Sequence, residues 1–159
     1  FKGTEGRLQK LENGAGVHVV VDYAHTTDAL ENVLKTLQSL QPQCLYVVFG
    51  CGGDRDKGKR PLMGATAANL ADQVFVTSDN PRSESPAAIL EDIMNGIDDT
   101  SEVFCIEDRR EAINTAIKQA EPGSIVLIAG KGHEKFQEIN GKKIAFDDVQ
   151  EAQKALGLR

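Results

Sequence analysis

Short apolar runs alternate with longer amphipathic segments along this chain, and the alternation predicts strands and helices in turn. Apolar runs of strand length, rich in β-branched residues, occur at 17–21, 45–49, 73–77, 102–106 and 124–129. Apolar residues at helical spacing predict helices at about 28–40, 62–70, 86–97, 109–120 and 148–156. The elements therefore follow one another as strand, helix, strand, helix.

Local signals predict where these elements begin and end. Acidic pairs three residues apart predict capped helix starts at Asp28, Asp108 and Asp148. Pro61 is expected in the first turn of its helix. Asn140-Gly141, between the segments 135–139 and 142–146, predicts a β-hairpin. Residues 1–16 are expected to hold one short strand at most.

This order of elements predicts an α/β fold: a Rossmann-like, doubly wound and mostly parallel sheet with a C-terminal β-hairpin, with room for an antiparallel edge strand. The most apolar run, 124–129, is expected near the centre of the sheet. The length of 159 residues fits one domain, so residues 1–159 are interpreted as a single domain.

Composition narrows the class of protein. The net charge of −6, without a basic run, argues against nucleic-acid binding. No apolar stretch approaches the ~20 residues of a membrane helix, and no signal peptide is visible, so we expect no membrane partner. Three cysteines without C-x-x-C spacing indicate a reduced, cytoplasmic protein and no zinc site.

Four polar loops each follow a predicted strand directly, at 22–28, 50–60, 78–84 and 130–134. In a parallel sheet these loops lie at one edge, where ligands of open α/β sheets bind. The loops expected at the opposite edge are plain turns. The sequence therefore predicts a ligand site at the edge formed by the carboxyl ends of the strands.

The loop Asp79-Asn80-Pro81-Arg82 carries both signs of charge. Asp79 can accept hydrogen bonds from an ammonium group, and Arg82 can bind a carboxylate or phosphate with two parallel bonds. Such a loop suits a zwitterion, such as an amino acid. The alternative is an ordinary Asx-type turn in which Arg82 only forms a salt bridge with Glu84.

The glycine-rich loop at 50–60 contains a partial match to the phosphate-binding P-loop motif. Gly53 to Lys59 fits G-x-x-x-x-G-K, but Arg60 stands where a P-loop needs Ser or Thr, and two aspartates would repel phosphate. We therefore reject a P-loop. The glycines instead suggest that backbone approaches another group closely, and the loop presents Arg55 and further cations.

No catalytic residue can be assigned from these patterns. His25 and His133 lack metal-binding spacing, and no Ser–His–acid triad is visible. Asp79 and Glu134 are candidates for paired carboxylates in acid–base chemistry, and we prefer them as acceptors for an ammonium group.

Four motifs occur in order along the chain: Asp-Tyr-Ala-His-Thr at 22–26, Gly-Gly-Asp-Arg-Asp-Lys-Gly-Lys-Arg-Pro at 52–61, Asp-Asn-Pro-Arg at 79–82 and Gly-Lys-Gly-His-Glu at 130–134. Together they resemble the C-terminal domain of the Mur ligase family over nearly the whole chain. The family's N-terminal UDP-sugar domain and central ATPase domain are absent. Phe1, without a methionine, favours a fragment over a natural stand-alone domain.

The resemblance implies an ATP-dependent amide-forming ligase in peptidoglycan precursor synthesis, and hence in cell-wall formation. The full-length enzyme would use ATP and Mg²⁺ to activate the carboxylate of UDP-MurNAc-L-Ala-D-Glu as an acyl phosphate, which the amine of meso-diaminopimelate attacks. This domain would close over its own central ATPase domain. Alone, it is expected to be inactive and to bind neither cofactor nor metal.

The resemblance also implies site residues. It assigns meso-diaminopimelate contacts to Arg55, Asp79, Asn80, Pro81, Arg82, Gly130 and Glu134, and it places Arg7, Asp22 and His25 on the ATP side. Arg82 would distinguish meso-diaminopimelate from lysine, because only the former ends its side chain in a carboxylate as well as an amine.

The sequence departs from the family's pattern at one position, and two alternative functions remain. The family usually has proline where Thr27 stands, and threonine still fits a first helical turn. A lysine-adding ligase of the same family is one alternative, which Arg82 disfavours. A stand-alone module that binds an amino acid or nucleotide is the other.

Overall fold

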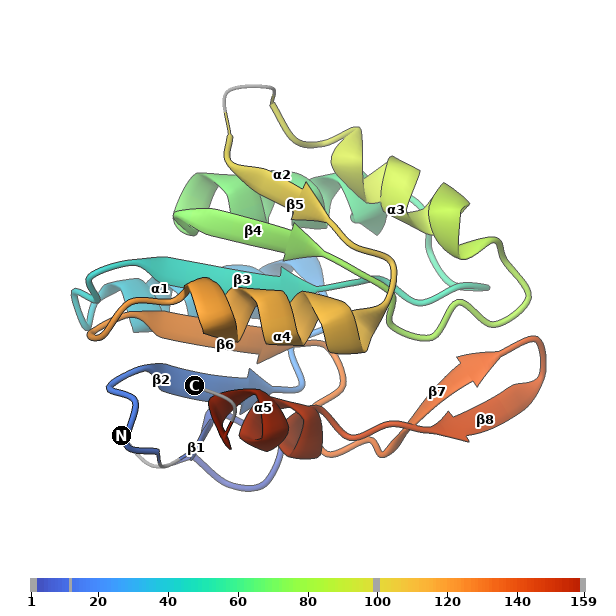
Figure 1. The fold of residues 1–159 in the computed structure, drawn as a ribbon. Helices are drawn as coiled ribbons and strands as arrows, with labels where there is room; N and C mark the ends of the chain where they lie inside the picture. Colours follow the sequence, from blue (N-terminus) through green and yellow to red (C-terminus); the bar gives the residue numbers. More distant parts are fainter. Residues whose placement is uncertain (1–2, 12, 99–100, 158–159) are drawn as a thin grey trace.

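The computed structural model describes residues 3–11, 13–98 and 101–157, and within them one mixed sheet forms the centre of the molecule (Figure 1). Its strand order is β1-β2-β6-β3-β4-β5. The strands are β1 (Gln9–Leu11), β2 (His18–Asp22), β3 (Leu45–Phe49), β4 (Gln73–Val76), β5 (Val103–Cys105) and β6 (Ile125–Ala129). Among the described residues, β1 is the only strand of this sheet that runs antiparallel to its neighbour.

Helices cover both faces of the sheet (Figure 1). Three pack on one face: α1 (Thr27–Gln38), α2 (Lys59–Leu70) and α3 (Pro86–Met94). On the other face lie α4 (Arg109–Gln119) and α5 (Asp148–Gly157). The central strands are buried on both sides, which explains why their sequences are continuous apolar runs.

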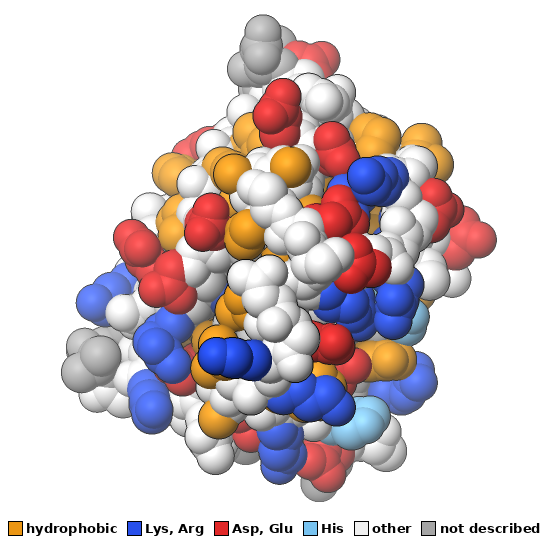
Figure 2. All heavy atoms as spheres, turned by 90° about the vertical axis from the view of Figure 1, so that its right-hand side faces the viewer, with side chains coloured by type: hydrophobic (Ala, Val, Ile, Leu, Met, Phe, Trp, Pro, Cys, Tyr) orange, Lys and Arg blue, Asp and Glu red, His pale blue; other side chains and the backbone are white. Residues whose placement is uncertain are grey.

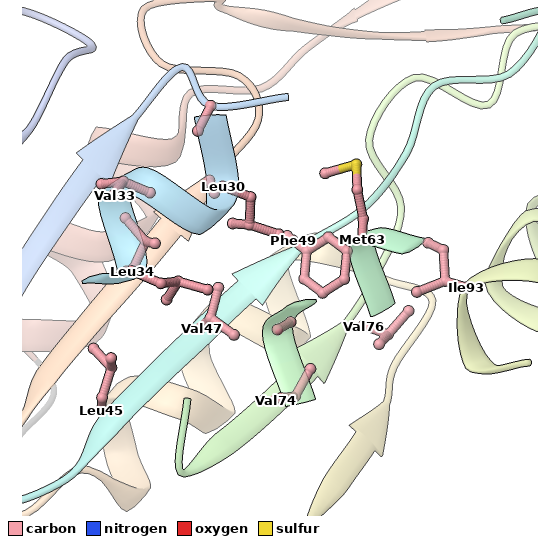
Figure 3. Packing of buried hydrophobic residues seen from close by; sticks show 14 of the residues in the cluster. Leu30, Val33, Leu34, Leu45, Val47, Phe49, Met63, Val74, Val76 and Ile93 are labelled. Atoms are coloured by element: carbon pink, nitrogen blue, oxygen red, sulfur yellow. The ribbon is translucent and has the colours of Figure 1, made fainter. Parts of the chain in front are cut away.

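Figure 3 shows the larger of the two cores. Alternate residues of β3, Leu45, Val47 and Phe49, point toward the first group of helices. Tyr46 and Val48 belong to the core on the other face. The period of two along a strand thus divides one apolar run between two cores.

The predicted fold is confirmed. The sheet is mostly parallel, β6 lies between β2 and β3, and the antiparallel edge is β1. The hairpin forms as β7 (Phe136–Ile139) and β8 (Lys142–Ala145), a separate two-stranded sheet beyond the carboxyl edge (Figure 1). No described helix has the length and apolar character needed to span a membrane.

Two of the predicted helix caps are wrong. Thr26, and not Asp28, caps α1, since its Oγ1 accepts the N–H of Ala29 at 3.2 Å. Asp147 accepts the N–H groups of Val149 and Gln150 at the start of α5. Asp148 is buried, where it pairs with an arginine.

The remaining helix starts agree more closely with expectation. Asp108 caps α4 as predicted. Helix α2 begins at Lys59 and not near 62, with Pro61 in its first turn as expected. Thr27 occupies the first position of α1.

Candidate functional site

The loops that follow β2, β3, β4 and β6 meet at the carboxyl edge of the sheet and enclose a pocket of about 390 Å³. Figure 2 looks onto this edge, where basic, acidic and histidine side chains gather together. The pocket is lined by Tyr23, His25, Gly52, Arg55, Lys59, Asp79, Asn80, Arg82, Gly130 and Glu134. Its volume lies within the ~300–1,000 Å³ that is usual for small-molecule sites.

Most of the residues predicted from the sequence line this pocket. Arg55, Asp79, Asn80, Arg82, Gly130, Glu134 and His25 do so. Pro81, within the loop at 79–82, is buried. Arg7 and Asp22 are not part of the lining and lie beside it, around the end of β2.

Arg82 is held by the hairpin. Its φ of 51° is in the left-handed region, which a non-glycine residue adopts only when surrounding contacts impose it. The Arg82 N–H donates to the Glu138 carbonyl at 2.8 Å, and the Asn140 N–H donates to the Arg82 carbonyl at 2.8 Å. The guanidinium donates from Nη1 to the Gly53 carbonyl at 2.9 Å, and its Nε lies 3.4 Å from Glu138 Oε1.

The alternative in which Arg82 pairs with Glu84 is wrong, because Glu84 binds a different arginine. Arg60 donates to both oxygens of Glu84, at 3.1 and 2.8 Å, and to Asp92 at 2.9 Å. Arg60 is fully buried. Arg60 therefore has a structural role at the end of the glycine-rich loop and does not contact a ligand.

This pairing changes the acidity of Glu84. Hydrogen bonds from the Arg60 guanidinium, and then from the Asp54 N–H, lower the pKa of the Glu84 carboxyl from 4.5 to about 2. Glu84 thus remains ionised under all ordinary conditions and holds the loop at 52–60 to the end of the loop at 78–84.

The glycine-rich loop packs backbone against backbone on the loop at 79–82. The Gly53 N–H donates to the Asn80 carbonyl at 2.7 Å. A Cβ on Gly53 would lie 1.9 Å from the Pro81 carbonyl oxygen. The predicted close approach is confirmed, and its partner is the neighbouring loop. It leaves Arg55 exposed at the mouth of the pocket.

Lys131 is a site residue that sequence reasoning missed. Its ammonium group is fully buried and donates to Asn80 Oδ1 at 2.7 Å and to the Phe136 carbonyl at 2.9 Å. It lies 2.9 Å from Asp79 Oδ1, as an ion pair without hydrogen-bond alignment, and 3.7 Å from Glu134. Lys131 neutralises part of the negative charge and fixes Asp79 and Asn80. Glu134, the more exposed carboxylate, is the better acceptor for a ligand ammonium.

Aromatic and basic side chains surround the end of β2. Arg7 lies over the Tyr23 ring, with 5.5 Å between its Cζ and the ring centroid, and the His25 ring meets Tyr23 edge-on at 4.6 Å. His25 Nδ1 is 2.9 Å from the Tyr23 carbonyl. A carbonyl only accepts, so Nδ1 carries the proton and Nε2 is an acceptor in the neutral ring.

Asp22 has a structural role at the same place. Its two oxygens accept the N–H groups of Leu8 and Ala24, each at 2.8 Å. These bonds fix the turn that leads from β2 to His25. Each carboxylate oxygen retains a second lone pair for a ligand hydroxyl.

Arg109 is a second residue that the sequence patterns did not single out. It is buried and forms a two-bond pair with Asp148, with both distances 2.8 Å. Its other donors reach the Ser78 carbonyl at 3.1 Å and the Ala129 carbonyl at 3.2 Å. These carbonyls lie where β4 and β6 give way to the pocket loops. Only long-range pairing identifies such a residue, and periodicity carries no signal for it.

The arrangement of possible metal ligands and the acidity of the Cys51 thiol bear on the chemistry of the site. Across the described ranges, no group of three or more His, Cys, Asp and Glu residues is arranged to hold a metal ion. Burial raises the pKa of the Cys51 thiol to about 12, so Cys51 is not a nucleophile at neutral pH.

Comparisons with known proteins agree with this architecture. Residues 6–132 match the family model described as Mur ligase, glutamate ligase domain. The whole chain is 53% identical to 32% of the UDP-N-acetylmuramoyl-L-alanyl-D-glutamate--2,6-diaminopimelate ligase of Trichormus variabilis. Identity is 51% to the enzyme of the same name from Pseudomonas aeruginosa, over 98% of this chain and 32% of that protein.

Solved structures give the same match. A structure of a UDP-N-acetylmuramoyl-L-alanyl-D-glutamate--2,6-diaminopimelate ligase superposes with a TM-score of 0.92 at 51% identity, over 99% of this chain and 32% of that one. A folylpolyglutamate synthase of Thermotoga maritima shares the fold at a TM-score of 0.57, 23% identity, and 80% and 28% coverage. The chain spans about a third of the curated relatives that it matches.

Proposed function

Because this chain belongs to the Mur ligase family, we propose that it is the C-terminal domain of an ATP-dependent ligase that adds meso-diaminopimelate to UDP-MurNAc-L-Ala-D-Glu in cytoplasmic peptidoglycan precursor synthesis. Its role there is to bind the incoming amino acid. The UDP-sugar and ATPase domains belong to the rest of the full-length protein, so this part alone is inactive.

The observation that carries the proposal is the mixed charge of the pocket. Arg55 and Arg82 stand in the same cavity as the carboxylate of Glu134. Meso-diaminopimelate carries two ammonium and two carboxylate groups, so it presents a partner for each sign of charge. Arg82 binds the side-chain carboxylate, and Glu134 accepts from an ammonium group.

The cluster at the end of β2 faces ATP in this proposal. Arg7 is exposed and supplies a positive charge, and His25 offers Nε2 as an acceptor. Asp22 has lone pairs free for ribose hydroxyls. We assign Mg²⁺ to the rest of the full-length enzyme.

Within the reaction this domain binds and orients. Held at both ends, the amino acid presents one amine in a fixed direction toward the activated carboxylate, which lowers the entropic part of the barrier. Closure of the domain excludes water that would otherwise hydrolyse the acyl phosphate.

Replacement of Arg82 tests the proposal. In the full-length protein with ATP and UDP-MurNAc-L-Ala-D-Glu, Arg82→Ala should lower kcat/KM for meso-diaminopimelate on the order of 100-fold, because a charged, hydrogen-bonded partner is lost. Any reaction with lysine should change little. Product formation is followed by phosphate release and by mass spectrometry.

Arg110→Ala is the matched control, since Arg110 is an exposed arginine on α4 that pairs with Glu151 outside the pocket. Its kinetics should equal those of the wild type. Wild-type protein that adds lysine as readily as meso-diaminopimelate would instead support the lysine-adding alternative. Binding of an amino acid without ligation would support the stand-alone module.

A further inference from the structure

We propose that Glu138, on the hairpin strand β7, is the positioning residue for Arg82 and determines which edge of its guanidinium meets the side-chain carboxylate of the amino acid. The proposal rests on the proposed function and extends it to a part of the chain that the four motifs do not include. Glu138 contacts Arg82 twice, through its carbonyl at 2.8 Å and its carboxylate at 3.4 Å.

The hairpin supports the whole loop at 79–82. The Gln137 side chain donates to the Asp79 carbonyl at 2.9 Å, and the Glu138 N–H donates to Asn80 Oδ1 at 3.0 Å. Arg82 forms a parallel β-bridge with Ile139. The loop at 79–82 is thus hydrogen-bonded to β7 at several points, so a shift of β7 moves Arg82 directly.

The carboxylate of Glu138 assigns the donors of the guanidinium. Glu138 Oε1 lies 3.4 Å from Nε as an ion pair without a hydrogen bond, and Nη1 donates one hydrogen to the Gly53 carbonyl. An arginine presents two forks to a carboxylate, one at Nε and Nη2 and one at Nη1 and Nη2. Because the Glu138 carboxylate beside Nε repels a second carboxylate from the fork at Nε and Nη2, the end-on fork at Nη1 and Nη2 remains for the ligand.

Glu138 stands behind Arg82 and not in the ligand's place. Arg82 lines the pocket, and Glu138 is not among the lining residues. Gly52 makes this arrangement possible, because a Cβ there would lie 2.8 Å from Arg82 Nη1. The Arg82 side chain is 19% exposed and that of Glu138 32%, so the pair is partly shielded from water.

The experiment measures steady-state kinetics of the full-length protein with Glu138→Ala, Glu138→Gln and Lys142→Ala. Loss of the orienting carboxylate should raise KM for meso-diaminopimelate roughly tenfold with little change in kcat, because binding weakens equally in the ground and transition states. KM for ATP and for the UDP-linked dipeptide should not change. Glu138→Gln, which keeps the shape and an acceptor oxygen, should give an intermediate KM.

Lys142→Ala is the control on the same hairpin, because Lys142 is exposed on β8. It should behave as wild type. An unchanged KM in Glu138→Ala would overturn the proposal, and so would a lower KM, which would mean that Glu138 competes with the ligand for Arg82.

A crystal structure of Glu138→Ala separates this proposal from the proposed function. We expect the Arg82 guanidinium to leave the Gly53 carbonyl. If it stays, Glu138 does not position Arg82, whatever the substrate. If it moves while the wild-type protein shows no preference for meso-diaminopimelate over lysine, the positioning role stands and the proposed substrate falls.

Discussion

Three positive charges lie inside the described part of the protein, on Arg60, Arg109 and Lys131. A buried charge is tolerated only when it is paired and hydrogen-bonded. Arg60 has Glu84, Arg109 has Asp148, and Lys131 has Asp79 together with two neutral acceptors. At the residue scale, the pocket loops are therefore fixed by ions that a ligand does not reach.

The Arg60–Glu84 pair makes stability depend on acid. The pKa of Glu84 is about 2 in the fold against an ordinary 4.5, so the stabilisation is fully present above about pH 4.5 and is lost as pH falls through 2. Glu84→Gln should remove this part of the acid dependence. Urea unfolding between pH 5 and 2 measures it, as the change in midpoint with pH.

Glu91→Gln, at an exposed position on α3, serves as the control and should retain the wild-type slope. A Glu84→Gln curve parallel to that of the wild type would show that the pair does not contribute to stability.

Single residues were the hardest part of the site to predict. The charged motifs pointed to the correct loops, because residue types and their position after a strand are local information. Lys131, the partner of Asp79, and Glu138, the partner of Arg82, were missed. Both also contact Asn80, which lies 51 residues from Lys131 and 58 residues from Glu138 along the chain. No periodicity encodes such a pairing.

At the scale of elements, the loop at 50–60 packs backbone against backbone on the loop at 79–82 around Gly53. Gly53→Ala should disturb this packing, because its Cβ would meet the Pro81 carbonyl oxygen at 1.9 Å. Overpacking of this kind costs about 1–3 kcal/mol. Equilibrium urea unfolding gives the loss, and KM for meso-diaminopimelate should rise with it.

Gly14→Ala is the matched control, since a Cβ on Gly14 meets nothing within 4 Å. Its free energy of unfolding should equal or slightly exceed that of the wild type. Equal effects of the two substitutions would argue against close packing at Gly53.

The elements themselves were largely predictable. Strands buried on both faces leave short apolar runs rich in β-branched residues, and α1 shows its buried stripe at Leu30, Leu34 and Leu37. Helix starts were less predictable, because several acceptors compete near each one. At the starts of α1 and α5, the side chains that accept the free N–H groups belong to Thr26 and Asp147, and not to the predicted Asp28 and Asp148.

At the scale of the whole molecule, the Arg109–Asp148 pair connects α4, α5 and the ends of β4 and β6. Asp148→Asn should destabilise the protein by roughly 3–5 kcal/mol, because it leaves a buried guanidinium without its charge partner. Thermal and urea unfolding measure the loss.

The double variant Arg109→Met with Asp148→Leu tests the interpretation, since it removes both charges. It should lose less stability than Asp148→Asn alone. If the loss of stability in the double variant equals the sum of the losses in Arg109→Met and in Asp148→Leu, the two residues act independently.

The position of β6 has a consequence for how the chain folds. Strands β2 and β3 are neighbours in sequence, yet both pair with β6, which arrives more than seventy residues after β3 ends. As the chain leaves the ribosome, β2 and β3 therefore wait with unpaired edges until residue 129 has been made. Non-local parallel pairing of this kind slows folding and exposes the growing chain to aggregation. The order in which the strands are synthesised thus leaves the facing edges of β2 and β3 exposed during most of the synthesis of this segment.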